Sequence, residues 1–198
     1  MNLPNKLTII RILMVPVFLT LLVLDFPHHY LAALIVFVAA SLTDMADGKI
    51  ARERGLITNL GKFLDPLADK MLTTAALLGF MVCGVGGVFG GVMGQMLMWV
   101  NFIVLSREFL VTSVRLLAAN NGRVVAANIY GKLKTVSQMT AIITTLAFEY
   151  FIGLGFTGDG INFTLRVIYA VLILISVVFT VMSGVIFAVQ NKEFISQK

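Results

Sequence analysis

The sequence predicts an all-α membrane protein in which six transmembrane helices form a single domain covering residues 1–198. Three observations support this fold class. First, 59% of the residues are hydrophobic and only 13% are charged, whereas a soluble domain has roughly 25% charged residues. Second, six segments approach the roughly 20 apolar residues that a helix needs to cross a bilayer. Third, the basic residues gather on one side of a six-span arrangement.

The six expected spans are separated by turn-forming sequences. Pro27 lies in the first connection, glycines recur from 84 to 94, Asn-Asn-Gly stands at 120–122, and glycines return between 153 and 160. The second span runs into aspartates, the third begins with aspartates, and the fourth carries three charged residues. We expect the spans at about 7–24, 30–45, 63–82, 93–117, 129–152 and 163–189.

Basic residues orient the expected bundle. With the N-terminus in the cytoplasm, all but one of the 15 Lys and Arg residues fall on the cytoplasmic side, and Arg166 is the exception. This is the positive-inside asymmetry of membrane proteins. Anionic lipid headgroups and phosphorylated substrates account for the basic side, so membrane lipids are expected partners and nucleic acid is not. The single cysteine, Cys83, excludes an intrachain disulfide.

Four aspartates gather where the second span ends and the third begins. Asp44 and Asp47 are three residues apart, and Asp65 and Asp69 are four apart. On a helix these spacings place each pair on one face. The connection between the two spans is short, so two antiparallel helices can direct four carboxylates at one another.

Such a cluster needs a compensating charge. An aspartate at the centre of a membrane helix costs roughly 2.5–3.5 kcal/mol on insertion scales. Divalent cations compensate for that cost, and carboxylates favour Mg²⁺, Mn²⁺ or Ca²⁺ over zinc. Two such ions, roughly 4 Å apart, can clamp the attacking and leaving oxygens of a displacement at phosphorus. The alternative for any single aspartate is an ion pair at a solvated rim with one of the neighbouring cations Lys49, Arg52, Lys62 and Lys70.

The spacing of this segment resembles the signature of the CDP-alcohol phosphotransferase family. The pattern is D-x2-D-G-x2-A-R-x8-G-x3-D-x3-D, and every fixed position is matched between Asp44 and Asp69. The resemblance implies a six-helix bundle of that family's type, a homodimer, and two divalent cations, Mg²⁺ or Mn²⁺. It assigns all four aspartates to the metals and Asp69 also to the deprotonation of the acceptor hydroxyl. The fixed positions are Asp44, Asp47, Gly48, Ala51, Arg52, Gly61, Asp65 and Asp69.

The donor implied by the resemblance is CDP-linked. We expect the small residues and the arginine of the motif to lie beside it, and the start of the first span to reach its nucleotide or phosphates. Asn5 and Thr8 fall on one helical face there, although a helix cap with an ordinary first turn explains them equally well. The expected donor-binding residues are Asn5, Thr8, Gly48, Ala51, Arg52 and Gly61.

Three segments narrow the choice of acceptor alcohol. Residues 2–11, Ser106-Arg107-Glu108-Phe109, and Gly131–Thr135 with Gln138 resemble the members of the family that act on sn-glycerol 3-phosphate. Arginine suits bidentate phosphate binding. We therefore expect the acceptor phosphate to be held by four cations, with the two arginines on one helix face; contact with lipid headgroups is the alternative. These cations are Arg107, Arg115, Lys132 and Lys134.

The expected reaction follows from the resemblance. CDP-diacylglycerol and sn-glycerol 3-phosphate would give phosphatidylglycerophosphate and CMP in a bacterial inner membrane, with the site facing the cytoplasm. Two alternatives stay open. One is another member of the family, of the cardiolipin, phosphatidylserine or phosphatidylinositol-synthase type. The other is a membrane cation transporter that uses intramembrane aspartates, which metal-dependent release of CMP would exclude.

Overall fold

The computed structural model describes residues 3–53, 59–85, 91–120, 129–155 and 157–191. Within these ranges the chain is helical apart from short connections and contains no strand, which confirms the all-α prediction and the number of helices. The helices are α1 (Leu3–Val23), α2 (His29–Glu53), α3 (Asn59–Val82), α4 (Gly91–Asn120), α5 (Ile129–Gly153) and α6 (Asp159–Gln190).

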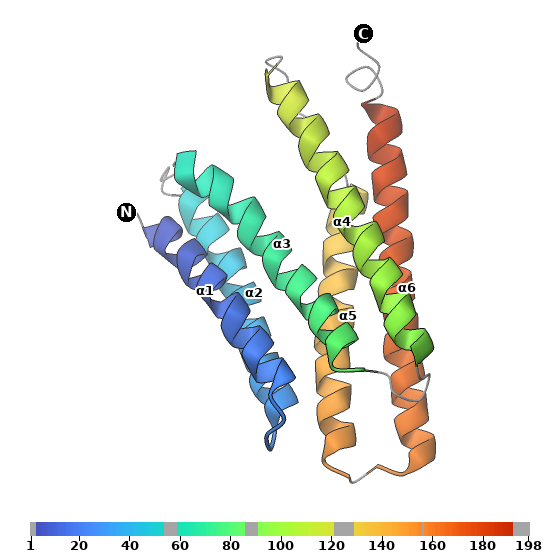
Figure 1. Ribbon diagram of the computed structural model, residues 1–198. Helices are drawn as coiled ribbons and strands as arrows, with labels where there is room; N and C mark the ends of the chain where they lie inside the picture. Colours follow the sequence, from blue (N-terminus) through green and yellow to red (C-terminus); the bar gives the residue numbers. More distant parts are fainter. Residues whose placement is uncertain (1–2, 54–58, 86–90, 121–128, 156, 192–198) are drawn as a thin grey trace.

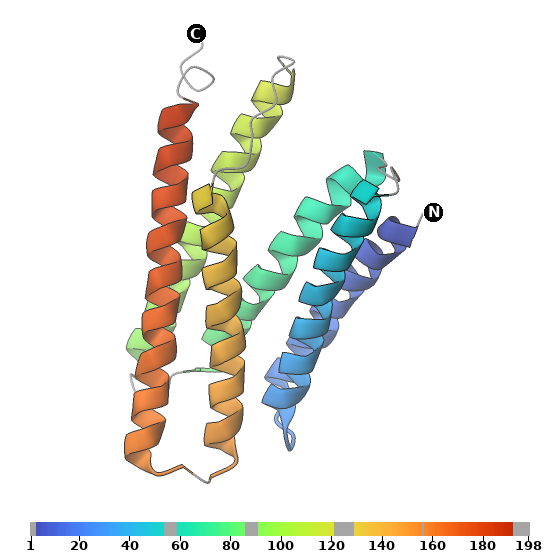
Figure 2. The same ribbon diagram turned by 180° about the vertical axis from the view of Figure 1, so that it is seen from behind.

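Successive helices run in opposite directions, and the two termini lie at the same end of the bundle (Figure 1). We call this end, where α2 finishes and α3 begins, the motif end. The opposite end, where α1 leads into α2 and α5 into α6, is the far end. Helices α1, α2 and α3 pack together, α6 packs on α4 and α5, and contacts of α2 with α5 and α3 with α4 join the two groups. Figure 2 shows α5 beside α6 from behind.

The helices around the aspartate motif are longer than the expected spans. Helix α2 continues past Asp44 to Glu53, and α3 already begins at Asn59. Both aspartate pairs therefore lie within regular helix rather than at its ends, which keeps each pair on one helical face. The side chains of Asp47, Asp65 and Asp69 lie outside the described part of the structure.

The first connection is tight. Leu24 N–H still donates to the Thr20 carbonyl at 3.0 Å, so the hydrogen-bonding of α1 runs one residue past its end. His28 then adopts a φ of 67°, a left-handed conformation that costs a non-glycine residue about 1–2 kcal/mol. This residue reverses the chain just before α2 begins.

Large apolar side chains cover the outside of the bundle. Among them are Trp99, Phe102 and Phe109 on α4 and Val178 and Val185 on α6, each more than half exposed. A soluble monomer rarely exposes so much contiguous apolar surface. In a bilayer these side chains face lipid, and the protein is a membrane protein.

The helices differ in the length of their apolar stretch. Among the described residues, three segments are long and apolar enough to cross a bilayer: Asn5–Val23, Gly94–Arg115 and Asp159–Gln190. Two apolar stretches, His29–Asp44 and Lys70–Val82, are shorter. Both belong to the helices that carry the aspartates, so the polar motif shortens their apolar part.

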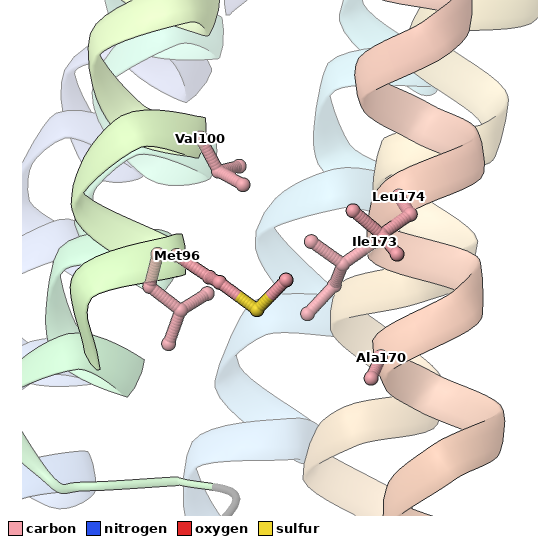
Figure 3. Close-up of a pocket in the computed structure, with 6 residues that line it drawn as sticks. Met96, Val100, Ala170, Ile173 and Leu174 are labelled. Carbon is pink, nitrogen blue, oxygen red and sulfur yellow. The ribbon is translucent and has the colours of Figure 1, made fainter. Parts of the chain in front are cut away.

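A small apolar cavity lies between α4 and α6. Its volume is about 30 Å³, close to that of one water molecule, but its lining offers no polar partner. Figure 3 shows Met96 and Val100 from α4 facing Ala170, Ile173 and Leu174 from α6. The cavity is therefore a packing gap rather than a binding site.

A buried polar cluster joins α5 and α6 near the far end. Tyr169 donates a hydrogen bond of 2.7 Å to Glu149 Oε1, and Arg166 Nε lies 3.5 Å from the same oxygen. Tyr169 and Glu149 are both buried. Because a buried carboxylate is costly without partners, this cluster fixes how the two helices pack.

Candidate functional site

Asp44 is the one motif aspartate whose side chain the structure describes. Arg11 Nη1 of α1 lies 2.6 Å from its Oδ1. The Arg11 side chain is only 1% exposed, whereas the Asp44 side chain is 34% exposed. The carboxylate is thus anchored by a buried cation while about a third of the side chain stays exposed. This partner of Asp44 comes from another helix, α1, and is not one of the flanking cations that the rim interpretation names.

Asn5, Thr8 and Arg11 form a polar row on α1. They are three residues apart and all buried, so they share the face that α1 turns toward its neighbours. This agrees with the expectation that Asn5 and Thr8 lie on one face. Since Arg11 ends the row at Asp44, the row leads along α1 to the aspartate motif.

A second polar cluster surrounds Glu108 on α4. Arg107 Nη1 and Lys134 Nζ donate to Glu108 Oε1 at 2.8 and 2.9 Å. Lys70 Nζ lies 3.6 Å from the other oxygen, Oε2. One carboxylate therefore gathers three cations from α3, α4 and α5. Lys70 directly follows Asp69, so this cluster adjoins the aspartate motif along the chain.

Arg107 is held from several sides. Its Nη2 donates to Ser183 Oγ of α6. A Cβ placed on Gly184 would lie 3.1 Å from Arg107 Cγ, and one on Gly131 would lie 3.7 Å from Nη2. The missing side chain at Gly184 therefore leaves the space that the arginine stem occupies. Arg107 Nε is buried and has no hydrogen-bond partner among the described residues.

Lys70 is fixed by α4 as well. Its Nζ donates to Thr112 Oγ1, and the Thr112 hydroxyl donates in turn to the Glu108 carbonyl at 2.8 Å. The ammonium group is thus placed by two residues one helical turn apart. Both of these contacts come from α4.

Two of the four expected acceptor cations do not join this cluster. Arg115 is exposed, and its guanidinium lies over the Phe187 ring, 5.7 Å from the centroid. Lys132 is also exposed, and no ion pair is recorded for it in the described ranges. The expected shared face of the two arginines is nevertheless confirmed. Arg107 bonds Ser183, and Arg115 lies over Phe187 one turn further along α6, so both arginines lie on the face of α4 that meets α6. Lys132 and Lys134 are two residues apart, which turns them about 200° from each other around α5.

Gln138 is buried one turn beyond Lys134. It is 1% exposed, and neither its amide oxygen nor its amide nitrogen has a hydrogen-bond partner among the described residues. An unsatisfied buried amide is costly and uncommon in a folded protein. Its place on the same helix face as Lys134 puts a spare donor and acceptor beside the cation cluster.

Comparison with known proteins decides the family. The family model described as CDP-alcohol phosphatidyltransferase matches residues 1–182, more than nine-tenths of the chain. The chain belongs to this family.

Several curated members of the CDP-alcohol phosphatidyltransferase family resemble the chain along most of its length, and they share the name CDP-diacylglycerol–glycerol-3-phosphate 3-phosphatidyltransferase. The protein from Bacillus subtilis (strain 168) is 41% identical over 157 residues, covering 73% of this chain and 76% of the relative. The Pseudomonas fluorescens protein is 32% identical, covering 79% and 80%. The Rickettsia typhi protein is 33% identical over 189 residues, covering 92% and 93%.

Members of the CDP-alcohol phosphatidyltransferase family use divalent metal ions. The described side chains contain no group of three or more His, Cys, Asp or Glu residues that could hold a metal. Three of the four motif aspartates, however, lie outside those side chains. The residues present fit a hard divalent cation: Asp44 offers a partly exposed carboxylate, and α2 and α3 contact one another.

No role of Arg11, Glu108 or Ser183 was predicted from the sequence, and Lys70 was expected only as a possible partner of an aspartate at a solvated rim. Glu108 carried a usable signal, since a carboxylate within an apolar span is expected to have a partner. Arg11 carried a similar signal as a cation in the first apolar helix. Ser183 had none, because its role depends on α6 packing against α4. The expected residues Asp47, Gly48, Ala51, Arg52, Gly61, Asp65 and Asp69 have side chains outside the described part of the structure, so their roles stay predictions.

Proposed function

We propose that this protein transfers the phosphatidyl group of CDP-diacylglycerol to sn-glycerol 3-phosphate, which makes it a phosphatidylglycerophosphate synthase. The observation that carries the proposal is the position of Lys70, which follows Asp69 and reaches the Glu108 cluster. A cation pocket suited to a phosphate thereby lies next to the aspartates suited to a metal-assisted displacement. The family match and the shared name of the relatives support the same activity.

The proposed reaction is a displacement at phosphorus. The free primary hydroxyl of sn-glycerol 3-phosphate attacks the phosphorus that carries diacylglycerol. A new P–O bond forms, the bond from that phosphorus to the bridging oxygen breaks, and CMP leaves with the bonding electrons. The hydroxyl proton passes to the Asp69 carboxylate, which needs only to be well positioned.

The motif aspartates Asp44, Asp47, Asp65 and Asp69 are proposed to hold two Mg²⁺ or Mn²⁺ ions. When bound, these ions would neutralise negative charge on the phosphates and acidify the acceptor hydroxyl. Arg11 keeps the Asp44 carboxylate in place for that role. That there are two ions, and that they are Mg²⁺ or Mn²⁺, is proposed here.

The donor is proposed to lie along the polar row of α1 and the small residues of the motif. Asn5 and Thr8 form that row with Arg11. In the proposal, Gly48, Ala51 and Gly61 would leave room for the nucleotide, and Arg52 would supply a cation. The acyl chains would stay in lipid beside the exposed apolar surface. The acceptor phosphate would bind at Arg107 and Lys134, with the exposed Arg115 and Lys132 at the outer edge.

We further propose that the protein is a homodimer in a bacterial inner membrane, with the motif end facing the cytoplasm. The basic residues concentrated toward that end support the orientation. The cation-transporter alternative does not fit a chain that belongs to the CDP-alcohol phosphatidyltransferase family.

A substrate panel tests the proposed activity. The purified protein would be given CDP-diacylglycerol with Mg²⁺ or Mn²⁺ and, separately, sn-glycerol 3-phosphate, glycerol, inositol, serine and phosphatidylglycerol. Release of CMP and formation of phosphatidylglycerophosphate are expected with sn-glycerol 3-phosphate alone. Turnover with inositol or serine, but none with sn-glycerol 3-phosphate, would reject the acceptor while leaving the family unchanged.

A further inference from the structure

We propose that Glu108 is the positioning residue of the acceptor-phosphate pocket and sets the charge of that pocket. The inference rests on the proposed function and extends it to a residue that contributes no positive charge of its own. Glu108 gathers three cations, Lys70, Arg107 and Lys134, and reduces their summed charge from three to two.

The contacts show why one carboxylate can organise this pocket. Its Oε1 accepts from Arg107 and Lys134 at 2.8 and 2.9 Å, while its Oε2 faces Lys70 at 3.6 Å. The three cations come from three different helices. Because no two of these cations share a helix, backbone geometry within one helix does not bring them together. Their shared contact is the Glu108 carboxylate.

Burial makes the carboxylate necessary. The Lys134 side chain is only 8% exposed, and the Glu108 side chain only 15%. Like charges repel strongly where water is largely excluded, and a buried ammonium without a counter-charge is costly. Glu108 offsets both costs before any substrate arrives.

The remaining charge matches one class of ligand. A phosphate monoester carries about −1.5 to −2 at pH 7. Three cations and one carboxylate leave a charge of two, which such a phosphate neutralises. A neutral alcohol such as glycerol or inositol would leave it uncompensated, so this pocket selects an acceptor that carries a phosphate.

Arg107 and Lys70 are each held by a residue other than Glu108. Ser183 fixes Nη2, and the small Gly184 accommodates the side-chain stem. Lys70 is likewise held by Thr112. Glu108 is therefore the shared element that sets the distance between these anchored cations and Lys134.

Glu108→Gln tests the proposal, because it keeps the shape of the side chain and removes the charge. Without that charge the three cations move apart. We expect the KM for sn-glycerol 3-phosphate to rise at least tenfold, kcat to stay within threefold, and the KM for CDP-diacylglycerol to stay unchanged. Glu108→Asp keeps the charge on a shorter stem, and we expect a smaller rise in the acceptor KM.

Glu149→Gln is the matched control. Glu149 is also a buried glutamate with a cationic neighbour, but it lies near the far end. We expect this variant to unfold at a lower temperature and to keep the acceptor KM. If Glu108→Gln does not fold in detergent, Glu108→Asp carries the test, and an acceptor KM equal to that of the unchanged protein overturns the proposal.

Three other results with Glu108→Gln would overturn it. These are an unchanged or lower acceptor KM, a fall in kcat alone, and an equal rise in KM for both substrates. A calorimetric titration with inorganic phosphate separates this proposal from the proposed function. If the unchanged protein binds phosphate and Glu108→Gln binds it at least tenfold more weakly, the pocket assignment stands even where sn-glycerol 3-phosphate is not turned over. Equal binding by both proteins refutes the assignment.

Discussion

Arg11 Nη1 lies 2.6 Å from Asp44 Oδ1, so a cation buried in α1 holds the first aspartate of the motif in α2. Residues behind a metal ligand fix the direction of its lone pairs, and their loss commonly costs 10–100-fold in metal affinity or activity. With Asp44 assigned to a metal as proposed, Arg11 has this position although it lies outside the signature.

We predict that Arg11→Met lowers kcat about 10–100-fold and raises the Mn²⁺ concentration needed for half-maximal activity. Methionine keeps the apolar bulk of the arginine stem, so the fold should survive. Steady-state CMP release measured across a Mn²⁺ titration checks the effect. Lys6→Met is the control, because Lys6 is an exposed cation on the same helix; an equal loss in both variants would show that Asp44 is not the cause.

Asp65→Asn should remove most of the activity, by about 10²-fold or more, and leave the fold intact. The change replaces the charged carboxylate of a proposed metal ligand with a neutral amide of the same shape. CMP release and the unfolding temperature are measured together, and a chelator should abolish activity in the unchanged protein until Mg²⁺ or Mn²⁺ is restored. Asp159→Asn, at an exposed position on the far end, should stay active. Near-full activity of Asp65→Asn would contradict the two-metal proposal.

Gln138→Leu should stabilise the protein, by about 1–3 kcal/mol. Leucine removes a buried amide whose two polar atoms have no partner among the described residues. A higher unfolding temperature in detergent is the expected observation. The control, Gln95→Leu, changes an exposed amide on α4 and should have little effect. A lower unfolding temperature for Gln138→Leu would mean that the amide is satisfied in the folded protein.

The reactivity of Cys83 should depend on pH in a defined direction. Burial raises the pKa of the Cys83 thiol above its ordinary value of 9.0. Since only the thiolate reacts with iodoacetamide, labelling should be slow at pH 7–8 and should speed up only above pH 9. A raised pKa also means that folding favours the neutral thiol, so its contribution to stability is present below pH 9 and is lost at higher pH. Rapid labelling of the folded protein at pH 7.5 would contradict this.

The helices and the aspartate pairs could be predicted from sequence because both depend on local spacing. Apolar runs bounded by turn residues define helices, and spacings of three and four residues keep Asp44 with Asp47 and Asp65 with Asp69 on one face. Helix ends were less predictable: α2 continues to Glu53, since the motif between Asp44 and Glu53 contains residues compatible with helix outside the apolar core.

The partners of the cations could not be predicted in the same way. The contact of Glu108 with Lys134 joins residues that are 26 positions apart on two different helices, and Arg11 meets Asp44 through the packing of α1 on α2. Spacing correctly predicted that Arg107 and Arg115 share a face of α4, since both contact α6. It could not predict their different partners: Arg107 joins Glu108, whereas Arg115 lies over the Phe187 ring.

The distribution of the pocket over the chain has a consequence for its biosynthesis. Lys70, Arg107 and Lys134 come from three successive helices, and Ser183, which holds Arg107, comes from the last one. In the proposed assignment, a growing polypeptide that has inserted only its first helices would contain the aspartate motif but would not yet hold the acceptor phosphate. Full activity would then require the docking of the last helix, and a truncated chain would not consume CDP-diacylglycerol.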